Sequence, residues 1–221
     1  MKKLKVLLAC EESQAVCMEF RKLGHEAYSN DILPVSGGHP EWHLQMDALE
    51  AIKIMDWDLM IAFPPCTHLA VSGAAWFEQK RKDGRQQQGI DFFMEFTKTK
   101  IPRWAIENPI GIMSKIYRKP NQIVHPFYFN EPFSKSTCLW LHNLPPLFHA
   151  SSTDLFNDTV THVEPTDRMI FGNKVYTFAS NKWYKSEEER HKDRSKTFPG
   201  IAKAMATQWS EYINNQIHKP R

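Results

Sequence analysis

Apolar runs alternate with amphipathic stretches along the first part of the chain. Residues 4–9 form a hydrophobic run typical of a buried strand, residues 14–23 repeat apolar side chains at helical spacing up to Gly24, and residues 26–30 form a second strand-like run that ends at Asp31. A strand, a helix and a strand in this order predict a βαβ unit, and therefore a parallel sheet with right-handed crossovers.

This pattern continues to about residue 142 and then loosens. We expect strands at 44–47, from 58, from 103, at 123–129 and at 137–141, helices at 48–55, 89–97, 187–194 and 201–217, and a long polar loop before residue 88. The sequence therefore predicts an α/β fold with a doubly wound, mostly parallel sheet. Its expected parts are a core at 1–142, a small irregular insertion at 143–190, and a segment at 191–221 whose helix returns to the core.

Composition narrows the class of protein. The chain has 221 residues, of which 42% are hydrophobic and 24% charged, so we expect a folded, soluble protein and not a disordered one. No apolar stretch approaches the length of a membrane span, and we expect a cytoplasmic location. The four cysteines lack metal-type spacing, so we expect neither a disulfide framework nor a metal site. The net charge of +3 permits nucleic-acid binding without requiring it.

Reactive side chains follow two of the predicted strands. The strand from residue 58 ends in Pro64 and Pro65, which lead directly into Cys66, and the strand from residue 103 ends in Glu107 and Asn108. The carboxyl ends of buried parallel strands present functional side chains at one edge of a sheet. The sequence therefore predicts a thiol and a carboxyl group side by side.

This pair suits a particular reaction. A thiolate adds readily to an electron-poor carbon such as position 6 of a pyrimidine, and a protonated acid such as Glu107 assists by protonating the ring nitrogen. A thiol hydrolase is the alternative, but His68 has no evident orienting partner. Free cysteines are most often small buried hydrophobes, which is our expectation for the three others, Cys10, Cys17 and Cys138.

The ends of the first strands offer candidate ligand groups. The loop at 9–14 reads Ala-Cys-Glu-Glu-Ser-Gln and contains no glycine, which disfavours a pyrophosphate cofactor. Asp31 ends the second strand, the position at which nucleotide-binding α/β folds bind a ribose. Asp47 can accept a hydrogen bond from an exocyclic amine such as that of adenine. Glu11 and Glu12 can meet a cationic group. For each of these acids a helix cap or a turn is the alternative role.

The segment after Cys66 resembles a lid. Small residues, aromatic residues and clustered positive charge over 72–88 suit a loop that closes on nucleic acid, although solvated helix ends would read the same way. A flipped base also needs a side chain to occupy its vacated place. The candidate DNA-binding residues are Trp76, Lys80, Arg81, Lys82, Arg85 and Gln86. A second basic cluster comprises Arg190, Lys192, Arg194 and Lys196.

At these motifs the chain resembles the DNA cytosine-5 methyltransferases, in a compact form like the phage-encoded members. Pro65 and Cys66 are similar to the family's Pro-Cys nucleophile motif, Glu107 and Asn108 to its Glu-Asn motif, and residues 196–203 to its last motif, which returns to the first strand. The resemblance implies a Rossmann-like methyltransferase fold, DNA as a partner, S-adenosylmethionine as a cofactor and, for a phage protein, the host cytoplasm. The cofactor-binding residues it implies are Cys10, Glu11, Glu12, Ser13, Asp31, Ile32, Asp47, Ala48 and Pro64.

Three departures from that family leave alternatives open. The first motif, Phe-x-Gly-x-Gly, is absent, so the donor is either S-adenosylmethionine or a different one-carbon donor. No Gln-x-Arg-x-Arg motif is present, and Lys135 is the candidate for the positive charge beside the base. The region for target recognition is small, which implies a short DNA site or a partner protein. Rival hypotheses are the same chemistry on a free nucleotide, a DNA-binding module without activity, and an amino-group methyltransferase, which the residue at Phe63 disfavours.

Overall fold

The computed structural model describes residues 2–131, 133, 135–149, 167–171, 174–178 and 196–217. Most of the expected insertion at 143–190, the expected helix at 187–194 and the basic residues Arg190, Lys192 and Arg194 lie outside this part of the chain.

A seven-stranded sheet forms the centre of the molecule, in the order β3-β2-β1-β4-β5-β7-β6. β7 runs antiparallel to both of its neighbours, β5 and β6, and the other pairs are parallel. Strand order changes direction between β1 and β4, which is the edge position where doubly wound sheets bind ligands. The strands are β1 (Lys5–Ala9), β2 (Glu26–Asp31), β3 (His43–Gln45), β4 (Leu59–Ala62), β5 (Trp104–Pro109), β6 (Gln122–Val124) and β7 (Thr137–His142).

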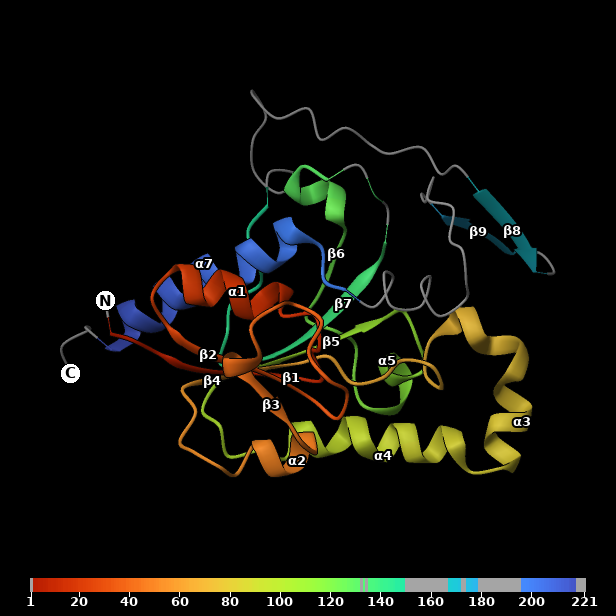
Figure 1. Cartoon of the computed structure of the whole chain (residues 1–221). Helices are drawn as coiled ribbons and strands as arrows, with labels where there is room; N and C mark the ends of the chain where they lie inside the picture. The colour runs from red at the N-terminus through yellow and green to blue at the C-terminus, as the bar shows by residue number, and fades with distance from the viewer. Residues whose placement is uncertain are drawn as a thin grey trace, which may run out of the picture.

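Helices cover both faces of this sheet (Figure 1). On one face α1 (Ala15–Lys22) and α7 (Pro199–Ile217) lie side by side, and their apolar side chains pack on those of the sheet. On the other face lie α2 (Ala48–Ala51), α4 (Arg85–Thr97) and α5 (Met113–Ile116). The strand order and the two cores confirm the expected doubly wound, mostly parallel α/β fold.

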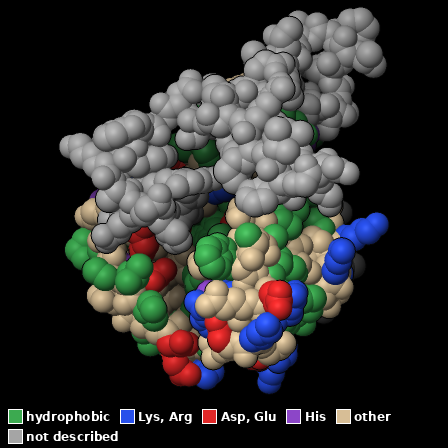
Figure 2. All heavy atoms as spheres, turned by 90° about the vertical axis from the view of Figure 1, so that its right-hand side faces the viewer, with side chains coloured by type: hydrophobic (Ala, Val, Ile, Leu, Met, Phe, Trp, Pro, Cys, Tyr) green, Lys and Arg blue, Asp and Glu red, His purple; other side chains and the backbone are tan. Residues whose placement is uncertain are grey.

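Two expectations for local structure are wrong. The stretch expected to be a long polar loop contains η2 (Val71–Trp76) and α3 (Phe77–Lys82), because straight-chain Glu, Gln, Lys and Arg favour helix even where apolar periodicity is missing. Residues expected to continue a strand form a 3₁₀ turn instead, η3 (Pro126–Phe129), which opens with a proline. Figure 2 looks onto the α3 side of the molecule, where positive and negative side chains are interspersed.

The C-terminal helix is anchored where the chain after β6 meets it. Gly200 lies so close to this segment that a Cβ atom there would come within 2.7 Å of Phe129 and Glu131, so only glycine fits. The Glu131 carboxylate accepts the backbone N–H of Gly200, and the Trp209 indole donates to the Pro145 carbonyl at 3.0 Å. These contacts bring residues 196–198 back to the carboxyl end of β5.

The remaining described strands pair with each other. β8 (Asp167–Phe171) and β9 (Lys174–Phe178) form an antiparallel pair. Among the described helices, none is both long enough and apolar enough to cross a membrane.

Candidate active site

The Cys66 loop and the Glu107 strand are tied together by a buried hydrogen bond. β4 and β5 pair in parallel up to Ala62 and Ile106, so the two chains leave the sheet side by side. Beyond that point the Asn108 side-chain amide donates to the Pro64 carbonyl at 2.7 Å. Asn108 is buried, and this bond fixes the position of the Cys66 loop relative to the strand of Glu107.

The loop turns sharply at Cys66 and is then pinned to the chain after β5. The Cys66 carbonyl accepts the N–H groups of Leu69 and Ala70, each at 2.9 Å. Ala70 forms a bridge with Gly111, where a Cβ atom would lie only 2.4 Å from the Leu69 carbonyl oxygen. The half-buried Cys66 thiol is therefore held on a short, closely packed turn.

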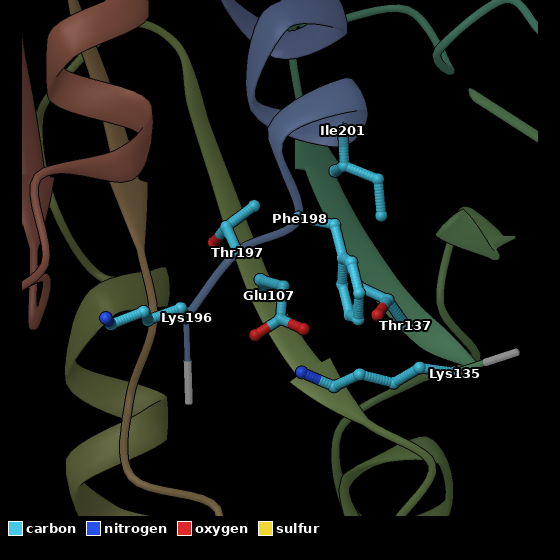
Figure 3. A pocket seen from close by; sticks show the side chains of 7 residues that line it. All are labelled: Glu107, Lys135, Thr137, Lys196, Thr197, Phe198 and Ile201. Atoms are coloured by element: carbon cyan, nitrogen blue, oxygen red, sulfur yellow. The ribbon is translucent and has the colours of Figure 1, made fainter. Parts of the chain in front are cut away.

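Glu107 lines a small pocket whose far wall comes from the C-terminal segment (Figure 3). Its carboxylate and the ammonium end of Lys135 point toward one another in this pocket. Burial raises the pKa of Glu107, while the charge of Lys135 and a hydrogen bond from Thr137 oppose that rise. The pocket is lined by Glu107, Lys135, Thr137, Lys196, Thr197, Phe198 and Ile201.

Five of those pocket residues were not assigned to the site from the sequence: Thr137, Lys196, Thr197, Phe198 and Ile201. Residues 196–203 were expected to pack beside the first strand, and nothing in their spacing relates them to Glu107, far away along the chain. Phe198 lies with its ring 5.8 Å from the Lys135 ammonium. Only the docking of α7 brings this aromatic ring to the carboxyl end of β5.

The other three thiols differ from Cys66 in their surroundings. All four cysteines are free. Burial raises the pKa of Cys17 and of Cys138 to about 12, and it also raises the pKa of Cys10. These three thiols therefore stay protonated at neutral pH. Within the described residues no group of three or more His, Cys, Asp or Glu side chains is arranged to hold a metal ion.

The loop after β1 adopts left-handed backbone at two residues that are not glycine. Cys10 and Gln14 both have a φ of 60°. L-residues pay about 1 kcal/mol for this conformation, which is why glycine usually occupies it. Although the loop has no glycine, it makes left-handed turns of the kind that glycines allow.

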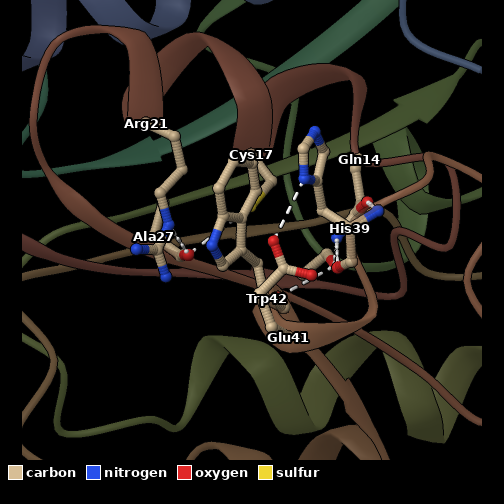
Figure 4. Close-up of polar contacts among 8 residues, drawn as sticks. Gln14, Cys17, Arg21, Ala27, His39, Glu41 and Trp42 are labelled. Carbon is tan, nitrogen blue, oxygen red and sulfur yellow. Dashed lines mark hydrogen bonds and ion pairs between the residues drawn. The ribbon is translucent and has the colours of Figure 1, made fainter.

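A neighbouring loop braces this turn (Figure 4). The Gln14 side chain donates to the His39 carbonyl at 2.8 Å and accepts the His39 N–H at 3.0 Å. Glu12 accepts both the backbone N–H and the hydroxyl of Ser36. At Gly37 a Cβ atom would lie 2.4 Å from the Ser13 carbonyl oxygen, so the two loops pack as closely as backbone allows.

Beyond this brace Arg21 closes an open sheet edge. β3 pairs only with the second half of β2, and the Arg21 guanidinium donates to the Ala27 carbonyl at 2.7 Å on the uncovered half. The same guanidinium lies 4.9 Å from the rings of Tyr28 and Trp42. A blocked edge protects the sheet from pairing with another chain.

Glu11 caps the first helix. Its two carboxyl oxygens accept the backbone N–H groups of Val16 at 2.6 Å and Cys17 at 3.2 Å. Burial raises the pKa of Glu11 to about 8, although these two bonds favour the charged form. The structure thus places Glu11 in the capping role that was the alternative to cofactor binding, and its carboxyl group occupies the anion-binding end of α1.

The other predicted cofactor residues lie at or shortly after the carboxyl ends of β1, β2, β3 and β4. The charges of both Asp31 and Asp47 contribute to the raised pKa of Cys10, so the three groups share one edge of the sheet. Asp31 accepts the Leu33 N–H at 2.9 Å, and Asp47 caps α2 by accepting from Leu49 at 2.8 Å. Ile32 is 71% exposed at this edge, whereas the side chains of Ala48 and Pro64 are buried and that of Ser13 is half-buried.

The predicted DNA-binding residues fall into two groups. Trp76 is 63% exposed, Arg81 is exposed, and the exposed side chains of Lys82 and Arg85 pair with Glu78 at 2.8 Å and Asp83 at 2.5 Å. Lys80 and Gln86 are instead buried, and they donate to the carbonyls of Thr67 at 2.6 Å and His68 at 3.3 Å. These two side chains therefore bind the backbone of the Cys66 loop and are not exposed to solvent, so they are not available for the predicted DNA contacts.

Comparisons with known proteins leave the activity to be argued from this geometry. No family model matches the chain, and no curated protein matches its sequence. Among solved structures, the S. pombe Dnmt2 methyltransferase is similar, with 16% sequence identity and a TM-score of 0.43 over 74% of this chain. The match covers 58% of that protein, so this chain spans less than two thirds of its length.

Proposed function

We propose that this protein transfers a methyl group from S-adenosylmethionine to carbon 5 of cytosine in DNA, through a covalent bond between Cys66 and carbon 6 of the base. One observation carries the proposal: the 2.7 Å bond from Asn108 to the Pro64 carbonyl ties the strand of Glu107 to the Cys66 loop. A nucleophile and a protonatable acid are thereby held together at the ends of adjacent strands, the arrangement that addition to a pyrimidine needs.

In the first step the Cys66 sulfur forms a bond to carbon 6 of the ring. The electron pair of the 5,6 double bond moves toward ring nitrogen 3, and Glu107 supplies the proton that this nitrogen takes up. The raised pKa of Glu107 suits this task, because the carboxyl group keeps its proton closer to neutral pH than an ordinary glutamate does. Lys135, whose ammonium faces Glu107, then stabilises the carboxylate that remains.

In the second step carbon 5 becomes the nucleophile. Bound S-adenosylmethionine supplies an electrophilic methyl carbon, and its sulfur keeps the electron pair of the broken bond. Carbon 5 then loses its proton to solvent, the bond between Cys66 and carbon 6 breaks with its electron pair on sulfur, and ring nitrogen 3 returns its proton to Glu107. The thiolate, the protonated glutamate and the neutral aromatic ring are thereby restored.

The residues at the ends of β1 and β2 fit such a donor. Asp31 and Asp47 both act on Cys10, so two carboxylates face one space, as a ribose and an adenine amino group require. The exposed Ile32 provides an apolar surface for the purine ring. Cys10 and Gln14 give the backbone the turn that brings the first loop to the donor, and Glu12 and Ser13 belong to the same loop.

The lid after Cys66 supplies the DNA contacts in this proposal. Trp76 is exposed on η2 and is long enough to fill the space that a flipped base leaves. Arg81, Lys82 and Arg85 bring positive charge to the same side for the phosphate backbone. Sequence selection is assigned to the small insertion at residues 143–190, or to a partner protein.

A mechanism-based trap tests the proposal. DNA carrying 5-fluorocytosine is incubated with the protein, with and without S-adenosylmethionine, and the intact mass of the protein is measured. Fluorine at carbon 5 blocks the final proton loss, so the enzyme stays bound to DNA through Cys66. We expect an adduct only with the donor, its loss in Cys66→Ala, and its retention in the neighbouring Thr67→Ala. Donor-dependent adduct formation by Cys66→Ala would contradict the mechanism.

A different one-carbon donor is the second candidate function, and the capping role of Glu11 favours it. Its carboxyl group occupies the end of α1 where an anionic part of a cofactor would otherwise bind. An adduct with a folate-type donor, and none with S-adenosylmethionine, would select this candidate. An adduct with 5-fluorodeoxycytidine monophosphate in place of DNA would assign the reaction to a free nucleotide. DNA binding without an adduct in any arm would identify a binding module.

A further inference from the structure

One lysine in the basic stretch after Cys66 is buried. Lys80 is only 8% exposed, although Arg81 and Lys82 beside it on α3 are exposed. Its ammonium group donates to the carbonyl oxygen of Thr67 at 2.6 Å, and Thr67 directly follows Cys66. A lysine is almost never this buried unless a carboxylate pairs with it, and none of the ion pairs found among the described residues includes Lys80.

The loop is shaped to receive this ammonium group. At Gly73 an added Cβ atom would lie 3.2 Å from the Lys80 nitrogen and 3.5 Å from the Thr67 carbonyl oxygen, so the absence of a side chain leaves room for the bond between them. Gln86 donates to the next carbonyl, that of His68, from the other side. Side chains from α3 and α4 therefore hold consecutive carbonyls of the turn that carries Cys66.

The charge of Lys80 reaches the groups of this turn. The pKa of His68 is lowered by burial first, and then by the charges of Lys80 and Arg85, while Asp83 opposes them. The charged groups that act on His68, two residues after Cys66, are thus Lys80 on α3 and Asp83 and Arg85 at the junction of α3 and α4. Glu107 lies at the end of β5, which pairs with the strand that leads to Cys66. Asp83 is paired with Arg85, which leaves Lys80 as the buried positive charge without a carboxylate partner among the described residues.

We infer that Lys80 is a positioning residue for the nucleophile: its buried ammonium stabilises the Cys66 thiolate and holds the Cys66 turn in place. The inference rests on the proposed function, because that function makes Cys66 the nucleophile. The predicted effect of Lys80 on the Cys66 thiol can nevertheless be measured in the protein without DNA or donor. A buried charge without a carboxylate partner costs folding free energy. The Lys80 ammonium contacts Thr67, the residue after the nucleophile. This placement explains why the cost is tolerated, because a nearby cation lowers the pKa of a thiol.

The test is the pH dependence of Cys66 alkylation by iodoacetamide in the free protein, followed by peptide mass. Cys66 is expected to react first, because burial raises the pKa of the other three thiols. The rate rises with the thiolate fraction and then reaches a plateau. Wild type is compared with Lys80→Met, Lys80→Arg and the control Lys98→Met, which removes an exposed lysine paired with Glu95 at the end of α4.

We expect Lys80→Met to move the midpoint upward by about one pH unit, which lowers the rate at pH 7 several-fold and leaves the plateau unchanged. Lys80→Arg, which keeps the charge, should stay near wild type, as should Lys98→Met. Because a buried charge is screened weakly, the shift should persist in high salt. An unchanged midpoint in Lys80→Met, or a changed plateau alone, would overturn the inference.

A second variant keeps the test decisive if Lys80→Met does not fold. Gly73→Ala leaves the lysine in place and crowds its ammonium away from the Thr67 carbonyl. We expect a smaller upward shift of the same midpoint, and no shift would again overturn the inference. The experiment uses neither DNA nor donor, so failure of the proposed transfer reaction would show as a missing fluorocytosine adduct while the alkylation midpoints still differ.

Discussion

The two halves of the proposed active-site edge of the sheet are built in different ways. At the ends of β4 and β5 the side chains named by the sequence motifs carry the proposed chemistry, and Asn108 ties them together through the Pro64 carbonyl. At the ends of β1 and β2 the important feature is backbone shape, with Cys10 and Gln14 in left-handed conformation and Glu11 filling the end of α1. Reactive groups are therefore visible in the sequence as residue types, whereas the backbone shape of the proposed cofactor site is not. Four predictions test this contrast, from the largest expected effect to the smallest.

The largest loss of activity is expected when Glu107, in the half formed by the ends of β4 and β5, can no longer donate a proton. Glu107→Gln keeps the shape of the side chain but removes proton transfer, so we predict a fall in single-turnover rate of about 10²–10⁴-fold with DNA binding retained. In wild type the rate should fall as pH rises through the raised pKa of Glu107, because the deprotonated acid cannot protonate the ring. Rapid-quench kinetics over a pH series measures both effects. A variant as fast as wild type would remove Glu107 from the mechanism.

In the half formed by the ends of β1 and β2, the buried carboxyl group of Glu11 should make the free energy of unfolding depend on pH. Glu11 is protonated in the folded state up to a pKa of about 8 but titrates near 4.5 when unfolded. Its contribution is therefore fully present below pH 4.5 and is lost as pH rises through 8, on the order of a few kcal/mol.

Urea denaturation of Glu11→Gln against wild type from pH 5 to 9 checks this. We predict that the unfolding free energy of the variant falls less steeply with rising pH than that of wild type, because a glutamine side chain does not titrate. The matched control Glu19→Gln changes a carboxylate that is only partly buried and is paired with the exposed Lys22, and it should leave the pH dependence as it is. Parallel curves for Glu11→Gln and wild type would show that the carboxylate stays charged in the fold.

Asn108 should link stability to activity. Asn108→Ala leaves the Pro64 carbonyl without its donor inside the protein, which costs about 1–3 kcal/mol of unfolding free energy. Because the same bond positions the Cys66 loop, the adduct with 5-fluorocytosine DNA should also form more slowly. Chemical denaturation and adduct kinetics measure the two effects. Loss of stability with an unchanged adduct rate would limit Asn108 to a role in folding.

The smallest effect should come from the left-handed residue of the first loop. Cys10→Gly and Cys10→Ala both remove the thiol, but only glycine adopts a φ of 60° without strain. We predict that the glycine variant is more stable than the alanine variant by about 1 kcal/mol and binds the donor at least as well. Thermal unfolding and calorimetric donor titration measure this difference. Equal stability of the two variants would mean that the loop relaxes around residue 10.

The contrast between the two halves also explains which predictions succeeded. The alternating pattern that opened with Leu4 and closed with Ile217 was sufficient to predict the doubly wound sheet, because buried strands and amphipathic helices have strong periodic signals. The helix in the stretch before residue 88 was mistaken for a polar loop because α3 is stabilised by helix propensity and by the buried Lys80, and neither produces an apolar stripe. Lys80 and Gln86 look like their exposed basic and polar neighbours in the sequence, and only the packing of the turn distinguishes them.

The sequence by itself determined the fold class and the reactive residue types, because both are written in local patterns: strand ends followed by Cys66 and by Glu107. The tertiary structure alone decided three things. It brought Phe198 to Glu107 from the far end of the chain, turned Glu11 into a helix cap, and placed the ammonium of Lys80 beneath the Cys66 turn. Each of these depends on contacts between segments distant in sequence, and on burial that shifts the pKa of an ordinary side chain, neither of which a local pattern can specify.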